Sequence, residues 1–132
     1  MESQYSNTAI VIETLSQIQK AIKQLLEWNK DISSYEDYLT TQEGTKILAA
    51  NCMLIEAIGE GIKKIDRKTD KTLLPLRPEI PWSEIMGMRD HIAHGYFDID
   101  AELVFETIKN DIEPLSQAIS YLLESLYKKN KM

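Results

Sequence analysis

Residues 88–97 bring together side chains that suit chemistry at a phosphate group. Arg89 carries a guanidinium, whose rigid fork of donors binds phosphate oxygens and never loses its charge. His94 follows five residues later, and its imidazole can transfer a proton near neutral pH. Such a pair could cleave RNA if His94 takes the 2′-hydroxyl proton, or protonates the leaving oxygen, while Arg89 neutralises charge on the phosphorane. Tyr96 adds a phenol two residues beyond His94, and the scheme requires no metal ion.

The spacing of Arg89 and His94 sets a geometric condition on this hypothesis. On an ideal α-helix five residues turn by about 500°, so the two side chains would point about 140° apart. They converge only if the helix ends or distorts near His94, or if a second copy of the segment faces the first. Gly95 makes a helix end possible, and a homodimer would supply the second copy. On spacing alone, an arginine and a histidine on a helix are more often ordinary surface groups than catalysts.

The two histidines also allow a metal site to be considered. His91 and His94 lie three residues apart, which makes them neighbours on a helix. A two-histidine site would need a third ligand, for which Asp98, Glu56 and Glu60 are candidates. Glu56 and Glu60 lie one turn apart and could themselves bind a metal or act as acid and base. The simpler interpretation is that Glu60 pairs with a lysine three or four residues further on.

Other kinds of site find little support in the sequence. The one cysteine, Cys52, lies within an apolar helical pattern, which predicts a buried thiol and excludes an internal disulfide. A strand-borne nucleophile elbow, a Walker loop and a dinucleotide fingerprint are all absent from the sequence. Five basic residues gather between positions 63 and 71, where they either form a solvated helix end or contact phosphate.

The composition is that of one globular domain, which we place at residues 1–132. The chain has 43% hydrophobic and 27% charged residues, and its length allows a core without disulfides. The net charge of −6 argues against a non-specific nucleic-acid coat protein, but it allows an enzyme with a local positive cleft. No run reaches the ~18 apolar residues of a membrane span, and a signal-peptide pattern is absent. We therefore expect a cytoplasmic protein without membrane association.

Apolar residues recur at three- and four-residue steps along most of the chain, which predicts helices. Because no segment shows the alternation of a strand, the expected fold is all-α, an antiparallel bundle of five to six helices without a sheet. The first three expected helices cover residues 7–29 with a cap at Ser6 or Asn7, residues 34–40, and a stretch from the Thr41 cap to about 65. After a connector over 66–81, the next helices cover 81–95, a stretch from Asp98 or Asp100 to about 110, and a last stretch to about 128. A solvated tail is expected from there to Lys131.

Two local signals refine this picture of the helices. Ser33 and Ser34 each precede an acidic residue by three positions, which resembles a capping box for the short helix. Gly59 and Gly61 lie inside the second long helix, where each costs about 1 kcal/mol relative to alanine. Glycine at such positions often lets another backbone come close, so we expect a neighbouring segment to pack there.

Two longer segments are similar to the signature of HepT-like proteins, which belong to the HEPN superfamily. The first reads P-E-I-P-W-S-E-I-M-G-M-R-D-H-I-A-H-G-Y-F-D-I-D over residues 78–100 and contains the motif R-x-x-x-x-H-x-Y from Arg89 to Tyr96. The second reads L-I-E-A-I-G-E over residues 54–60, in the preceding long helix. Together with the order of helices, the resemblance covers nearly the whole chain.

The resemblance implies an all-α HEPN bundle that acts as a homodimer, with the two motifs lining a shared cleft. It implies a metal-independent ribonuclease without a cofactor, the toxin of a type VII-like toxin–antitoxin pair whose antitoxin is a small nucleotidyltransferase. By position, Arg89 and His94 match the catalytic pair. Tyr96 matches the tyrosine that the partner modifies with AMP, which adds bulk and negative charge that would repel RNA.

Asp90 departs from the family pattern, which more often has Asn after the arginine. Its carboxylate could orient the guanidinium of Arg89 or, if unpaired, weaken RNA binding. This departure and the acidic net charge keep a second interpretation open, a non-catalytic HEPN module that binds a nucleotide or a nucleotidyltransferase partner. For the catalytic interpretation, we expect Arg89 and His94 to meet at a distorted helix end beside a dimer cleft, with Tyr96 at its rim.

Overall fold

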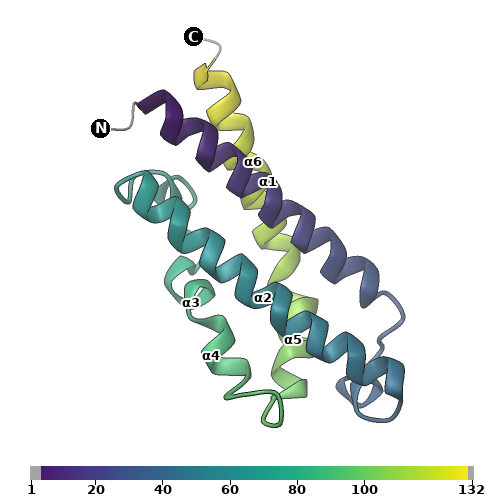
Figure 1. Ribbon diagram of the computed structural model, residues 1–132. Helices are drawn as coiled ribbons and strands as arrows, with labels where there is room; N and C mark the ends of the chain where they lie inside the picture. The colour runs from purple at the N-terminus through teal and green to yellow at the C-terminus, as the bar shows by residue number, and fades with distance from the viewer. Residues whose placement is uncertain (1–3, 131–132) are drawn as a thin grey trace.

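The computed structural model describes residues 4–130, which form six α-helices and two short 3₁₀ helices (Figure 1). Within this range there is no β-sheet, and Ala93 and Ile99 form one isolated antiparallel bridge. The all-α prediction is therefore confirmed. The elements are α1 (Gln4–Trp28), η1 (Tyr35–Tyr38), α2 (Gln42–Lys68), η2 (Leu74–Leu76), α3 (Trp82–Met86), α4 (Met88–Ile92), α5 (Ala101–Asn110) and α6 (Ile112–Asn130).

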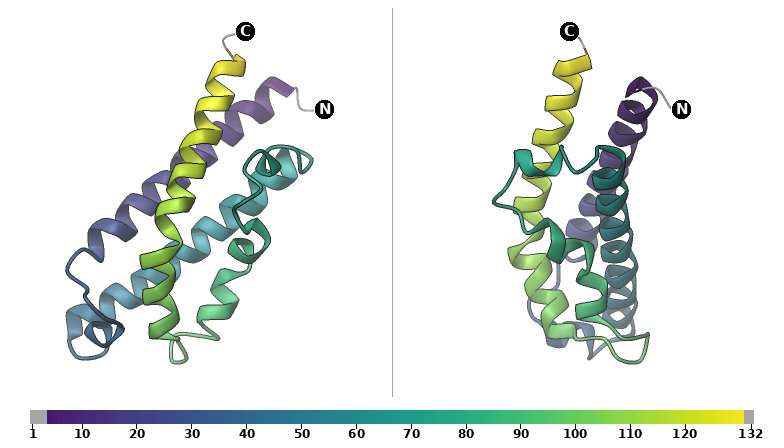
Figure 2. Two further views of the ribbon diagram at one scale, coloured as in Figure 1. Left: turned by 180° about the vertical axis from the view of Figure 1, so that it is seen from behind. Right: turned by 90° about the vertical axis from the view of Figure 1, so that its left-hand side faces the viewer.

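The three long helices form the body of the bundle. Helix α1 packs against α2 and against α6, and Figure 2 shows that it runs antiparallel to both. Helices α3 and α4 lie along α2, while α5 contacts η1, α2 and α6. None of the helices in residues 4–130 is long and apolar enough to cross a membrane. The fully buried side chains of the core include Leu15, Ile22, Leu25, Ile62, Ile65, Ile119 and Leu122.

The predicted ends of the helices are correct in part. Helix α1 begins at Gln4, so the expected cap at Ser6 or Asn7 is wrong because both residues already lie inside the helix. Helix α6 extends to Asn130 instead of ending near 128. Residues 1–3, and Lys131 of the expected tail, lie outside the described residues.

Side-chain caps begin two of the helices as the sequence predicts. The Thr41 hydroxyl accepts a hydrogen bond from the backbone N–H of Gly44 at 2.9 Å, at the start of α2. Of the two candidate caps for α5, the structure uses Asp100, whose carboxylate accepts from the N–H of Leu103 at 3.0 Å. Each bond satisfies a backbone donor that has no partner within its own helix.

A buried polar cluster joins α1, η1 and α2. The side-chain amides of Asn29 and Asn51 hydrogen-bond each other at 2.8 and 3.0 Å, and the Tyr38 hydroxyl donates to Asn29 at 2.6 Å. Burial raises the pKa of Tyr38 to about 12, so its hydroxyl stays a hydrogen-bond donor at neutral pH. Because buried polar groups are costly without partners, this cluster favours a single alignment of α1 against α2.

The prediction of one continuous helix over residues 81–95 is wrong. The chain instead forms α3 and α4, separated at Gly87, and α4 ends at Ile92, three residues before the expected stop at Gly95. Glycine has a low helix propensity, and the Gly87 N–H donates to Glu84, three residues back, in place of a regular helical bond. The break allows α3 and α4 to follow the surface of α2 separately.

Helix α3 approaches the backbone of α2 at Gly59, as the sequence predicts. A Cβ atom on Gly59 would lie 3.0 Å from the carbonyl oxygen of Ile85 and 3.2 Å from that of Met86. Gly61 differs from this expectation, because its neighbour is the side chain of Ile18 on α1 and not a backbone. Gly59 therefore sets the distance between α2 and the segment that carries Arg89.

We predict that Gly59→Ala destabilises the protein although alanine is the better helix former. The propensity gain of about 1 kcal/mol is outweighed by the clash with two carbonyl oxygens, so the unfolding free energy falls by about 1–2 kcal/mol. Urea unfolding measures this change. Gly87→Ala is the matched control, because a Cβ there meets only the Ser83 oxygen at 4.0 Å. Equal stability of the two variants would contradict the close contact.

Candidate functional site

Residues 93–99, which we call the 93–99 hairpin, follow α4 and carry His94 and Tyr96. Ala93 is extended, with φ −156° and ψ 137°, and pairs with Ile99 across the hairpin. The N–H of His94 donates to the carbonyl of Asp98 at 3.0 Å, and the N–H of Asp100 donates to that of Ile92 at 2.7 Å. These bonds close the hairpin between the end of α4 and the start of α5. The sequence shows no alternating pattern here, so it gives no signal for the hairpin.

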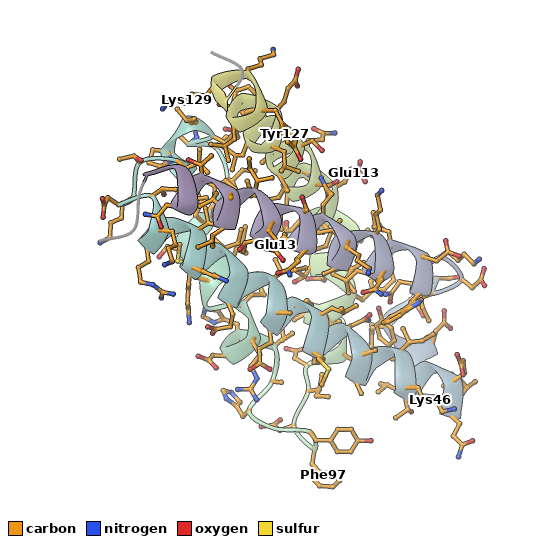
Figure 3. The ribbon with its side chains drawn as sticks, turned by 45° about the horizontal axis from the view of Figure 1, so that its top comes forward. Glu13, Lys46, Phe97, Glu113, Tyr127 and Lys129 are labelled. Carbon is orange, nitrogen blue, oxygen red and sulfur yellow. The ribbon has the colours of Figure 1, made fainter. Side chains whose placement is uncertain are left out.

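The tip of the hairpin presents two aromatic rings to solvent. Gly95 has a φ of +147°, a conformation that residues with a side chain rarely adopt, and it turns the chain there. Tyr96 is 64% exposed and Phe97 is 97% exposed, with their ring centroids 5.1 Å apart in an edge-to-face arrangement. Figure 3 shows Phe97 at the end of the loop, directed away from the helices. Tyr96 is thus accessible for chemistry at its hydroxyl.

Arg89 lies in the first turn of α4 and faces two carboxylates. Its Nε is 3.9 Å from Oε2 of Glu56 on α2, and its Nη1 is 3.7 Å from Oδ1 of Asp90. Both distances exceed that of a hydrogen bond, and all three side chains are substantially exposed. Exposed pairs of this kind contribute little stability, so the guanidinium can exchange these partners for a phosphate. Asp90 therefore pairs loosely with Arg89.

The end of α4 at Ile92 changes the relation between Arg89 and His94. Three helical steps and two extended steps separate them, which places their Cα atoms roughly 12 Å apart or less. His94 no longer follows the helical spacing that would turn it away from Arg89, and its side chain is exposed. Among the described residues no hydrogen bond joins the two side chains, and both are exposed.

The carboxylates considered for a metal site have other neighbours. Glu60 pairs with Lys63 at 3.2 Å, which is the simpler of the two predicted interpretations. Glu56 faces Arg89, a contact that the sequence did not predict because it depends on how α4 packs against α2. Over residues 4–130, no three histidine, cysteine, aspartate or glutamate side chains are grouped as ligands for a metal ion.

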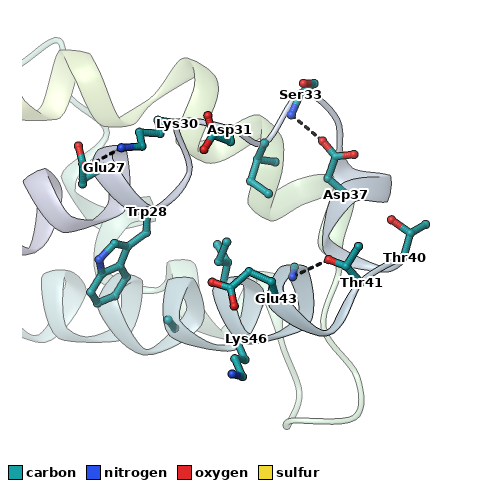
Figure 4. A pocket seen from close by; sticks show the side chains of 14 residues that line it. Glu27, Trp28, Lys30, Asp31, Ser33, Asp37, Thr40, Thr41, Glu43 and Lys46 are labelled. Atoms are coloured by element: carbon teal, nitrogen blue, oxygen red, sulfur yellow. Dashed lines mark hydrogen bonds and ion pairs between the residues drawn. The ribbon is translucent and has the colours of Figure 1, made fainter.

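An open depression of about 870 Å³ lies between the end of α1 and the start of α2, and we call it the α1–α2 depression (Figure 4). Its polar groups have local structural partners. Asp37 accepts from the N–H of Ser33 at 2.7 Å, and Lys30 pairs with Glu27 at 2.9 Å. Residues 88–97 do not line it. Its size reflects the shape of the surface where the two helices are connected. Because the motif residues lie elsewhere, we place the candidate functional site at Arg89 and the 93–99 hairpin.

Comparisons with known proteins agree with the motif. The model of the family described as ribonuclease HepT-like matches residues 7–122. A protein of Thermococcus cleftensis, named "Probable ribonuclease HepT", is 36% identical over 76% of this chain and 84% of its own length. Two proteins of Methanocaldococcus jannaschii with RNase names are 31% and 30% identical, over 80% and 81% of this chain and 84% and 88% of theirs. No solved structure matches the chain.

We predict that Cys52 reports on the position of Arg89. Burial raises the pKa of the Cys52 thiol, while the positive charge of Arg89 lowers it. In Arg89→Met only the effect of burial remains, so the pKa of the thiol rises further above its ordinary value. The pH dependence of Cys52 alkylation measures this pKa. Arg89→Lys, which keeps a positive charge, should stay close to wild type; identical profiles for all three proteins would place Arg89 away from α2.

Proposed function

The chain belongs to the ribonuclease HepT-like family, and on this premise we propose that it cleaves RNA as the toxin of a toxin–antitoxin pair. The observation that carries the proposal is the end of α4 at Ile92, between the two proposed catalytic residues, Arg89 and His94. Arg89 projects from α4, while His94 and Tyr96 lie on the 93–99 hairpin, and all three side chains are exposed. A phosphodiester can therefore reach the proposed guanidinium–imidazole pair.

The proposed reaction is an attack of the RNA chain on its own phosphate. His94 takes the proton of the ribose 2′-hydroxyl, the 2′-oxygen forms a bond to phosphorus, and the bond from phosphorus to the 5′-oxygen breaks. The 5′-oxygen leaves with a proton from water or from His94 of a second copy. Arg89 donates hydrogen bonds to the oxygens that gain charge on the phosphorane. In this scheme the protein supplies the proton transfer and the charge, without a metal ion or a cofactor.

A homodimer is part of the proposal because a single chain leaves the site open to water. Electrostatic stabilisation of a developing charge is stronger when water is excluded. His94 and both rings of the 93–99 hairpin are exposed, so one chain alone does not enclose the phosphate. A second copy that faces the hairpin would cover Phe97 and form a cleft between the two motifs. Light scattering on the purified protein tests this, with a mass of two chains expected.

Control of the toxin by its partner would act at Tyr96. A nucleotidyltransferase antitoxin transfers AMP from ATP when the Tyr96 oxygen bonds the α-phosphorus, pyrophosphate leaves and the phenol loses its proton. Support comes from the exposure of Tyr96 on a hairpin tip, two residues from His94. The added phosphate places negative charge beside Arg89 and His94, where it repels the RNA backbone.

The loose pairing of Arg89 with Glu56 and Asp90 favours one alternative function. Two carboxylates beside the guanidinium lower the local positive potential, which suits a non-catalytic module that binds a nucleotide or a nucleotidyltransferase. The distances of 3.9 and 3.7 Å argue for catalysis, because neither carboxylate holds Arg89 in a hydrogen bond. Cleavage assays separate the two functions.

We predict that His94→Ala lowers kcat/KM for RNA cleavage by about 10²–10⁴-fold, since it removes the group that moves the proton. Arg89→Ala should cause a loss of about 10²-fold or more, because charge on the phosphorane loses its partner. A fluorescently labelled RNA and purified protein give the rates. His91→Ala is the matched control, as His91 is also exposed on α4 and has no role in the scheme. Equal rates for wild type and all variants would contradict catalysis by Arg89 and His94 and favour the non-catalytic binding module. Full inhibition by a chelator would contradict the metal-independent reaction.

We predict that Tyr96→Phe keeps RNA cleavage but escapes control by the nucleotidyltransferase partner. Wild-type protein incubated with the partner and ATP should gain the mass of AMP on the peptide that contains Tyr96 and stop cutting RNA. Tyr127→Phe is the control, because Tyr127 is half-exposed on α6, away from the motif. AMP found on another tyrosine, or silencing of Tyr96→Phe equal to that of wild type, would refute this site of modification.

A further inference from the structure

The positive charge of this acidic chain is concentrated at the C-terminal end of α2. Residues 63–71 contain five basic residues and two carboxylates, a formal charge of +3, so the rest of the chain carries −9. A polyanion is repelled by most of such a surface and attracted to this part of it. The basic residues are Lys63, Lys64, Arg67, Lys68 and Lys71.

Several of these residues surround an open depression of about 440 Å³, which we call the α2-end depression. Lys63, Arg67 and Lys71 line it together with the carboxylates of Asp66 and Asp70 and the side chain of Met86 on α3. Its three cations exceed its two carboxylates by one positive charge, which equals the charge of one phosphodiester in magnitude. The depression therefore has the charge and the open shape for one segment of RNA backbone.

The end of α2 is shaped so that Lys71 joins this group. Asp70 and Lys71 have positive φ values of 50° and 62°, and the N–H of Lys71 donates to the carbonyl of Asp66 at 2.8 Å. This turn closes the helix and brings Lys71 back beside the last turns of α2. Lys63 is half-exposed and pairs with the exposed Glu60, so its ammonium can exchange that partner for a phosphate.

The α2-end depression and Arg89 lie along one face of α2. Positions 52, 56, 59, 63 and 67 follow each other at three- and four-residue steps, which places them on the same side of the helix. The charge of Arg89 affects Cys52 and faces Glu56, the residues at the first two positions. The carbonyls of α3 approach Gly59, and Met86 of α3 lines the depression. Along the helix axis, Lys63 and Arg67 are about 10 and 16 Å from Glu56. An extended RNA strand that leaves Arg89 along α3 therefore reaches the depression within a few nucleotides.

We propose that the α2-end depression is a second phosphate-binding site, which holds the backbone of single-stranded RNA a few nucleotides from the phosphate at Arg89. The proposal rests on the proposed ribonuclease function and names where the substrate binds outside the reacting centre. Basic grooves hold single strands through their phosphates without reading sequence. The site raises affinity for long RNA and takes no part in bond cleavage.

The test compares two pairs of charge-removing substitutions. Lys63→Gln/Arg67→Gln changes the α2-end depression, and Lys30→Gln/Lys46→Gln changes the α1–α2 depression. Both variants lose two positive charges from an open depression, and Lys30 pairs with Glu27 as Lys63 pairs with Glu60. All four side chains are exposed, and circular dichroism checks that both variants fold as wild type does.

Binding is measured in the His94→Ala background with a long unstructured RNA over a range of salt concentrations. Lys63→Gln/Arg67→Gln should weaken binding about tenfold at low salt and reduce the slope of log Kd against log salt by about 0.7–1.4, as for one or two lost phosphate contacts. The Lys30→Gln/Lys46→Gln control should bind as its parent does. Equal weakening in both variants would show an effect of net charge alone and overturn the site, as would unchanged binding.

Cleavage measured with His94 intact separates this site from the proposed function. Lys63→Gln/Arg67→Gln should raise KM for the long RNA and leave cleavage of a dinucleotide unchanged, because a dinucleotide does not reach the depression. Loss of dinucleotide cleavage would place these residues in the reacting centre and refute the proposal. If wild type cuts no RNA while binding still falls only in Lys63→Gln/Arg67→Gln, the ribonuclease function fails and the phosphate site stands.

Discussion

The absence of a side chain at position 59 allows α3 to lie directly on α2. The carbonyls of Ile85 and Met86 occupy the space that a Cβ would need, and no larger residue fits there without moving α3. Arg89 follows three residues after Met86, so its place beside Glu56 is a consequence of this contact. The 93–99 hairpin in turn starts where α4 ends. One close backbone contact therefore positions both parts of the candidate site.

The buried cluster of Asn29, Asn51 and Tyr38 fixes the position of α2, the helix on which that contact lies. Its hydrogen bonds are satisfied in one alignment of α1 and α2, and a shift along either helix would leave buried polar groups unpaired. Gly61 adds a steric contact to the same interface, where Ile18 fills the space beside it. Helix α2 is thus held between α1 and the α3–α4 segment. The segment that carries Arg89 is therefore packed against a helix that is itself held by α1.

The sequence predicts the helices better than it predicts their ends and contacts. Periodic apolar residues and the Thr41 and Asp100 caps are local signals, and the helices that depend on them are confirmed. The 93–99 hairpin is closed by a few short-range backbone bonds and has no alternating pattern, so the sequence gives no local signal for it. The break at Gly87 depends on how α3 and α4 pack against α2. For the same reason the motif shows which residues to examine, while the Glu56–Arg89 contact follows only from the fold.

The exposure of the site determines what the rest of an active complex must provide. A guanidinium that faces two carboxylates in water attracts a phosphate weakly, because solvent and salt screen each of these charges. Binding at the α2-end depression would raise the local concentration of RNA backbone near Arg89 without changing Arg89 itself. Exclusion of water is a separate requirement. One chain does not meet it, because Phe97 beside the site is 97% exposed. Affinity for RNA would then come from the end of α2, while a second copy that covers the hairpin would exclude water. Substitutions can therefore alter the two requirements independently.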